Sequence, residues 1–150
     1  MPVPFNLYEQ LKNLTSKEYT KLFEEIPKEV SQQAANWFPN QEKGWDNQKD
    51  AARHALWAAT LADRYGKLPA KAMTTAWEVP GLLMGDPGSA MDLYNNASGI
   101  EMSDQFANWR ELMDAIRTEA ELAESKRVDP FTTGQGLITV PRGKYNSSMY

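Results

Sequence analysis

The residues with chemical potential in this chain lie in three short segments within apolar sequence. The first is Asp50-Ala51-Ala52-Arg53-His54-Ala55, which contains the single histidine. The second is Glu78, and the third is Met91-Asp92-Leu93-Tyr94-Asn95-Asn96, followed by Gly99. Because polar groups cost free energy when they are buried in Ala- and Leu-rich sequence, their presence here needs a reason. These segments are the candidate functional site.

The first segment suits acid–base chemistry. Residues four apart share one face of an α-helix, so Asp50 can orient one nitrogen of His54 while the other faces a cleft. Such a histidine is a candidate general base. Arg53 projects about 100° away around the helix. The structural alternative is a His54 that is hydrogen-bonded inside the core and takes no part in catalysis.

Glu78 is a second candidate acid or base. It lies between Trp77 and Val79-Pro80, an apolar setting in which loss of hydration raises the pKa of a carboxyl group. A salt bridge to Arg53 or Arg64 is the structural alternative. Trp77 and the other tryptophans are interpreted as anchors of the core and loops.

Asp92, Asn95 and Asn96 fall within about one and a half helical turns. Their oxygens could ligate Mg²⁺ or Ca²⁺, or could orient a substrate. Their spacing matches no calcium-binding loop, and asparagines that cap a helix before Gly99 are the structural alternative. No cofactor is therefore expected unless the site is catalytic, in which case Mg²⁺ or Ca²⁺ would fit.

The composition argues against several classes of site and partner. The 150 residues include no cysteine, which removes disulfides and thiolate-bound zinc. A net charge of −4 argues against nucleic acid as a partner. No serine lies in a Gly-x-Ser-x-Gly elbow, and Gly134-Gln135-Gly136 lacks the third glycine of a dinucleotide loop. No signal peptide is recognised, and no run reaches the roughly 18 apolar residues of a membrane span.

Helical periodicity predicts an all-α fold, a compact single-domain bundle of about six helices. The first segment lies on a helix expected between Asn47, a cap, and Gly66, a stop, and the small residues of this helix let another helix approach closely. The clearest apolar stripe belongs to a helix over 103–126. The other expected helices span 4–13, 15–26, 28–38, 69–78 and a short stretch from residue 89.

Residues 1–127 are expected to form the helical domain, and residues 128–150 an extended C-terminal tail. Only residues 137–140 of this Pro- and Gly-punctuated tail have the pattern of a strand. The tail is too short to bury a core alone, so it either docks on a neighbouring subunit or wraps around its own domain. The apolar Leu82-Leu83-Met84 segment, expected in a loop, is a further candidate contact surface.

The pattern Asp-x-x-Arg-His-Ala, then Glu, then Met-Asp-Leu-x-Asn-Asn-x-x-Gly resembles a family of small helical domains of unassigned function in bacterial and phage genomes. The resemblance covers about residues 47–101. The family pattern has a histidine where this chain has Trp77 and another where it has Tyr94. If those histidines hold a metal or move a proton, the resemblance implies that this chain has kept the polar network and lost the reaction. The matching residues are Asp50, Arg53, His54, Glu78, Asp92, Asn95, Asn96 and Gly99.

Two functions follow. The first is a bacteriophage virion structural component, a tail- or portal-associated subunit that is made in the host cytoplasm and assembles as a homo-oligomer. In it the polar network is structural and includes Arg53, Asn95, Asn96 and Gly99. The alternative is an acid–base or metal-assisted hydrolase of a cell-wall or ester substrate, with catalytic residues His54, Asp50, Glu78 and Asp92. An open pocket at these catalytic residues favours the hydrolase, and burial with mutual hydrogen bonds favours the structural component.

Overall fold

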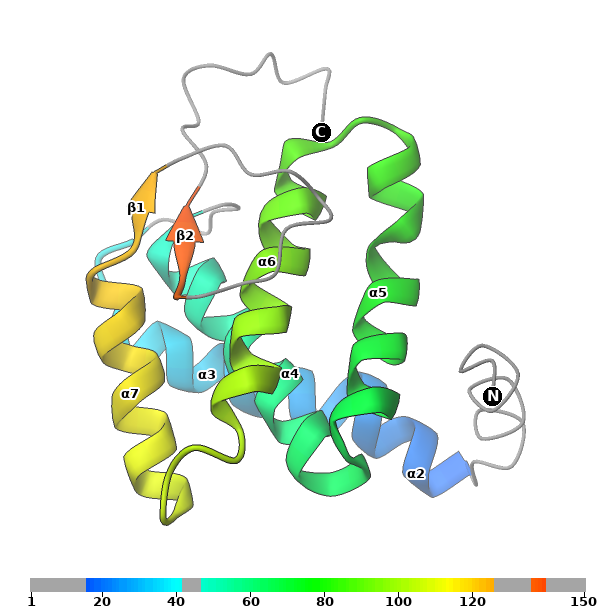
Figure 1. Ribbon diagram of the computed structural model, residues 1–150, viewed down its shortest axis with the longest axis horizontal. Helices are drawn as coiled ribbons and strands as arrows, with labels where there is room; N and C mark the ends of the chain where they lie inside the picture. The colour runs from blue at the N-terminus through cyan, green and yellow to red at the C-terminus, as the bar shows by residue number, and fades with distance from the viewer. Residues whose placement is uncertain (1–15, 42–46, 126–135, 140–150) are drawn as a thin grey trace.

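The computed structural model describes residues 16–41, 47–125 and 136–139 (Figure 1). These residues are mostly helical, which confirms the all-α prediction. The helix expected at 4–13 lies outside the described residues. The elements are α2 (Ser16–Thr20), the π-helix η1 (Lys21–Glu25), α3 (Ile26–Trp37), α4 (Gln48–Tyr65), α5 (Lys67–Leu83), α6 (Pro87–Met102), α7 (Trp109–Glu121), β1 (Glu124–Ser125) and β2 (Ile138–Thr139).

Helix α4 is the centre of the domain. It packs against α3, α5, α6 and α7 (Figure 1), and its inner face is formed largely by fully buried alanines such as Ala55. The helix begins after Asn47, whose Oδ1 accepts a hydrogen bond from the backbone N–H of Asp50 at 3.0 Å. It ends before Gly66, which has a φ of 93°. The predicted position and both end signals of this helix are confirmed.

Helices α4 and α6 approach so closely that only glycine fits at position 99. A Cβ added to Gly99 would lie 2.2 Å from the carbonyl oxygen of Ala55 and 2.8 Å from its Cα. Asn96 and Asp92 lie about one and two turns earlier on α6. The close approach therefore brings both side chains against α4.

The segment from residue 16 to residue 37 is one continuous helical path, whereas the sequence predicted a break near residue 27. Pro27 has no N–H to donate to the carbonyl four residues earlier. The backbone accommodates it after a widened π turn, in which the N–H of Ile26 bonds to the oxygen of Lys21. The proline thus changes the helix type instead of ending the helix.

Helix α5 extends beyond Glu78, where the sequence predicted its end. It includes Pro80 and continues to Leu83. Because Pro80 lies on the exposed side of the helix, water can reach the carbonyl that loses its backbone donor. Leu82 and Leu83, expected in a loop, consequently form the last helical turn.

Side-chain caps set the beginnings of α6 and α7. Asp86 accepts a hydrogen bond from the N–H of Gly88 at 2.8 Å, so α6 begins at Pro87, before the predicted start. Asn108 accepts one from the N–H of Glu111 at 2.9 Å, so α7 begins at Trp109. The prediction of a helix from residue 103 was wrong there, although Asn108 and Glu111 have the spacing of a capping box.

Part of the predicted C-terminal tail packs on its own domain. Strand β2 pairs in parallel with β1, with Glu124 opposite Ile138. Leu137 and Ile138 are buried, and β2 contacts α4 and α6. The rest of the predicted tail lies outside the described residues, so its docking on a neighbouring subunit stays a prediction.

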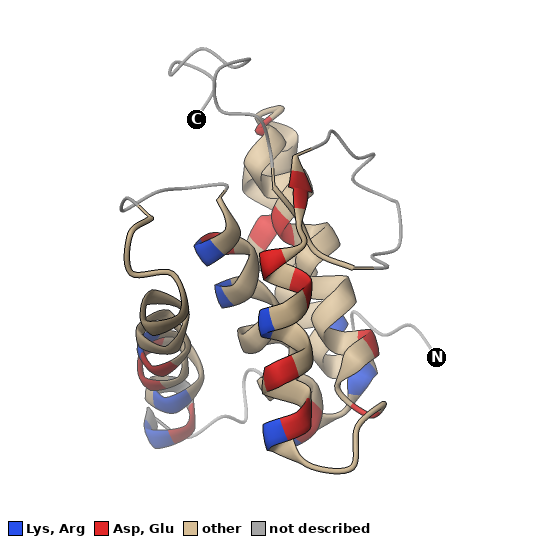
Figure 2. Cartoon of the chain, turned by 90° about the vertical axis from the view of Figure 1, so that its left-hand side faces the viewer, with Lys and Arg blue, Asp and Glu red and all other residues tan. Residues whose placement is uncertain are grey.

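Charged residues are distributed over several helices. Figure 2 shows Lys and Arg interspersed with Asp and Glu along the described helices, not gathered on one of them. None of the described helices combines the length and apolar character needed to cross a membrane.

Candidate functional site

His54 lies among polar side chains that three helices contribute. Its side chain is 10% exposed. We call this group the polar centre. It consists of Asp50, Arg53 and His54 from α4, Glu78 from α5, and Asp92 and Asn96 from α6.

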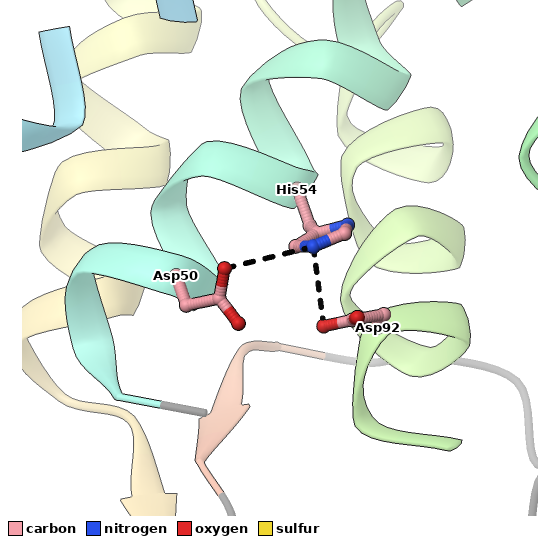
Figure 3. A group of neighbouring side chains, drawn as sticks. All are labelled: Asp50, His54 and Asp92. Carbon is pink, nitrogen blue, oxygen red and sulfur yellow. Dashed lines mark ion pairs between the residues drawn. The ribbon is translucent and has the colours of Figure 1, made fainter. Parts of the chain in front are cut away.

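Two carboxylates and a guanidinium face Nε2 of His54. Oδ1 of Asp92 lies 3.3 Å from this nitrogen, and Oδ1 of Asp50 lies 3.6 Å from it (Figure 3). Nη2 of Arg53 is 3.2 Å from the same nitrogen and forms an ion pair with Asp50. One ring nitrogen therefore joins side chains of α4 and α6.

The same atoms could hold a metal ion. The ligand atoms of Asp50, His54 and Asp92 lie within 4.8 Å of one another, and an imidazole with two carboxylates can accept a divalent cation. However, Nε of Arg53 also donates to Oδ1 of Asp50 at 3.1 Å. The guanidinium already supplies positive charge at this point, so a metal would have to displace it.

Asn96 and Glu78 face the other ring nitrogen of His54. Oδ1 of Asn96 lies 3.3 Å from Nδ1, and Oε1 of Glu78 lies 4.0 Å from it. Asn96 is 1% exposed, and its Nδ2 has no hydrogen-bond partner among the described residues. Turning the amide by 180° would let Nδ2 donate to Nδ1, and the ring would then carry its proton on Nε2, facing Asp92.

Burial keeps the imidazole of His54 neutral at physiological pH. Desolvation lowers the pKa of His54 from 6.5 to about 4, and the positive charge of Arg53 also lowers it. The negative charge of Asp50 and the hydrogen bond with Asn96 act in the opposite direction but do not outweigh burial. His54 is therefore an uncharged imidazole at neutral pH.

The same buried environment brings the pKa of Glu78 close to neutral pH. Desolvation raises the pKa of Glu78 from 4.5 to about 7, and the negative charges of Asp50 and Asp86 raise it further. A hydrogen bond with Ser89 and the charge of Arg53 oppose this shift. An acid–base group works best when its pKa is near the working pH, which Glu78 satisfies.

A pocket of about 150 Å³ adjoins the polar centre. Arg53 and His54 belong to both. The sequence analysis contrasted an open pocket, expected for a hydrolase, with a buried and hydrogen-bonded network, expected for a structural component. The polar centre combines the two, because it is buried and internally connected while its histidine lines a pocket. The pocket is lined by Phe23, Pro27, Val30, Ser31, Arg53, His54, Trp57 and Trp77.

Asn95 and Gly99 do not belong to the polar centre. Nδ2 of Asn95 donates to the oxygen of Ile138 at 3.0 Å, and Oδ1 of Asn95 accepts from the nitrogen of Ile138 at 2.9 Å. Asn95 therefore fixes β2 on α6, whereas Gly99 permits the approach of α4. The sequence grouped both with Asn96 because they share one segment, but their positions around the helix direct them elsewhere.

The aromatic wall of the pocket was missed by the sequence analysis. Trp77 is 62% exposed, and its ring stacks on Phe23 with centroids 6.1 Å apart. Trp57 meets Trp77 edge-on at 6.4 Å. The spacing along the chain could have indicated that these tryptophans lie near the polar centre, because Trp57 follows His54 by three residues and Trp77 directly precedes Glu78.

A family model described as "Domain of unknown function (DUF6973)" matches residues 10–125. The chain belongs to this family. The DUF6973 match contains every residue of the polar centre and ends before β2. It confirms a family of unassigned function, whereas the residue pattern expected for that family stays a prediction. No curated protein and no solved structure matches the chain. The link to phage genomes stays a prediction.

Proposed function

We propose that this protein is a hydrolase in which the polar centre activates a water molecule. The convergence of His54 with carboxylates from three helices, at the wall of a pocket, carries the proposal. Buried charges are costly, and well-packed apolar residues often stabilise a fold better. Three carboxylates beside a single guanidinium are thus poorly explained by stability alone.

In the proposed reaction, His54 accepts a proton from a water molecule in the pocket as the water oxygen bonds to the ester carbonyl carbon. The protonated His54 then gives this proton to the alcohol oxygen as the ester C–O bond breaks. Asp92 and Asp50 stabilise the resulting imidazolium, because their oxygens lie beside Nε2. Glu78 faces the opposite nitrogen and can exchange the proton at neutral pH. Arg53 presents positive charge to the oxygen that becomes negative in the transition state. Mg²⁺ or Ca²⁺ at Asp50, His54 and Asp92 would be the metal-assisted form of this proposal.

Ester hydrolysis gives a direct test. Purified protein is assayed with p-nitrophenyl acetate, butyrate and benzoate, with and without EDTA. Removing a general acid or base typically costs 10²- to 10⁴-fold in rate, so His54→Gln and Glu78→Gln should each lose about 100-fold or more in kcat/KM. Glu101→Gln is the matched control, because this carboxylate on α6 is 54% exposed. Turnover equal to wild type in both polar-centre variants would refute the catalytic role.

A second candidate function is the subunit of an assembly, in the form of a phage virion component. Leu83 and Met84 at the end of α5 are 84% and 83% exposed, and adjacent exposed apolar side chains often mark a protein contact. In this proposal they join copies of the chain into a homo-oligomer. Sedimentation of the wild-type protein should then show an oligomer that Leu83→Glu with Met84→Glu dissociates. Ala107→Glu, a charge added at another exposed site, should leave it assembled, and a monomeric wild type would exclude this candidate.

A further inference from the structure

We infer that the pocket beside the polar centre binds the aromatic acyl group of the substrate, a single ring joined to a carboxyl or ester carbon whose oxygen meets Arg53 and His54. This inference rests on the proposed hydrolase. It names the class of substrate that the pocket selects. Three independent properties support it: the size of the cavity, its aromatic wall and the polar groups at one side.

The size of the pocket suits one ring. Its volume is about 150 Å³, and an apolar cavity of roughly 150 Å³ is known to accommodate benzene. Val30 and Pro27 form apolar parts of the lining. A disaccharide or a long acyl chain would not fit within this volume.

The wall of the pocket suits a flat ring. Phe23 and Trp77 stack with an interplanar angle of 27°, and Trp57 meets Trp77 at 67°. Aromatic rings favour offset-stacked and edge-to-face neighbours, and this arrangement offers faces and edges in both orientations. An aromatic ligand gains these contacts in addition to the burial of its apolar surface.

The polar side of the pocket suits an oxygen-bearing head group. Arg53 and His54 line the pocket, and the Arg53 side chain is 41% exposed, which leaves it able to reorient toward a ligand. A carbonyl or carboxylate oxygen that enters the pocket could accept a hydrogen bond from Arg53.

Benzoate is the probe for this inference. It is titrated into the full-length protein at pH 8, with calorimetry and tryptophan fluorescence as the readouts. Saturable binding with one site is expected, and acetate, which lacks the ring, and benzyl alcohol, which lacks the charge, should each bind at least 10-fold more weakly. Benzoate should also inhibit the hydrolysis of p-nitrophenyl benzoate competitively.

Two substitutions connect the binding to the pocket. Ser31→Leu fills the cavity from α3 and should weaken benzoate binding at least 10-fold, whereas Gln32→Leu, at the next and exposed position, should not change it. Trp77→Ala removes an exposed wall of the pocket and should weaken binding similarly, whereas Trp109→Ala on α7 should not. Thermal melting verifies that each variant is folded. If Ser31→Leu does not fold, the comparison of Trp77→Ala with Trp109→Ala decides whether benzoate binds in the pocket.

The outcomes separate this inference from the proposed hydrolase. No saturable binding by wild type, or unchanged affinity in the folded pocket variants, overturns the pocket assignment, and the loss of turnover in Glu78→Gln would still support the hydrolase. Conversely, benzoate binding that depends on Ser31 and Trp77, together with full turnover in Glu78→Gln, upholds the pocket and refutes the hydrolase mechanism.

Discussion

Gly99→Ala is expected to destabilise the domain by roughly 2–4 kcal/mol, because the added methyl group meets backbone and not a movable side chain. The new Cβ would lie 2.2 Å from the carbonyl oxygen of Ala55, so α4 and α6 must separate. Both helices carry the polar centre. The distances from His54 to Asp92 and Asn96 should increase, and any ester turnover should fall even at temperatures where the variant remains folded.

Urea unfolding of the purified variant measures this effect. Ala76→Val is the matched control, since it adds apolar volume at an exposed position of α5, where substitutions usually change stability by less than about 0.5 kcal/mol. A Gly99→Ala variant as stable as wild type would show that the two helices can move apart at no cost, and the account of the α4–α6 contact would then be incorrect.

The local sequence signals predicted the helix at the centre of the domain well. Asn47, Gly66 and the small residues of α4 act within one element, and their effects do not depend on distant parts of the chain. The convergence of Asp50, His54 and Asp92 was inferred from the concentration of polar residues in apolar segments. Burial gives this inference its physical basis, because such residues must find partners inside the core.

The pocket could not be predicted in the same way, because it depends on how helices far apart in sequence cross. Phe23 lies on η1, whereas Trp57 and Trp77 lie on α4 and α5. The sequence interpretation took the tryptophans as anchors of the core and loops. It does not show that they enclose a cavity beside His54.

The structure also changes the interpretation of the two missing histidines. Trp77, at one of these positions, lines the pocket, and Tyr94, at the other, is 7% exposed within α6. Neither position belongs to the polar centre, whose carboxylates and histidine are all present. The two departures from the pattern expected for the family are therefore weaker evidence for a lost reaction than the sequence alone indicated, and Trp77 lies where it could alter the substrate proposed for the pocket.

Opposite pH dependences of folding stability are expected from the two shifted groups of the polar centre. Burial raises the pKa of Glu78 in the folded protein to about 7, against an ordinary value of 4.5, so this group makes the fold less stable as the pH rises between these values. Burial lowers the pKa of His54 in the folded protein to about 4, against an ordinary value of 6.5. This group makes the fold more stable as the pH rises from 4 to 6.5.

In wild type the two contributions should largely cancel between about pH 4.5 and 6.5, and single substitutions should expose them. Relative to wild type, Glu78→Gln should gain about 3 kcal/mol of unfolding free energy as the pH rises from 4.5 to above 7, where wild type carries a buried charge. His54→Gln should lose a similar amount, about 3 kcal/mol, relative to wild type as the pH rises from 4 to above 6.5. Urea unfolding at intervals across this range, in buffers containing EDTA, measures both differences.

Glu101→Gln is again the control, because this carboxylate on α6 is 54% exposed and lies outside the polar centre. Parallel stability curves for wild type, Glu78→Gln and His54→Gln would contradict the prediction, since neither group would then sit in the desolvated environment that the packing of α4, α5 and α6 creates. Opposed slopes would place a neutral base and a protonated acid side by side at pH 6 to 7. That pairing lets the polar centre accept one proton on His54 and release another from Glu78 without a change in its net charge.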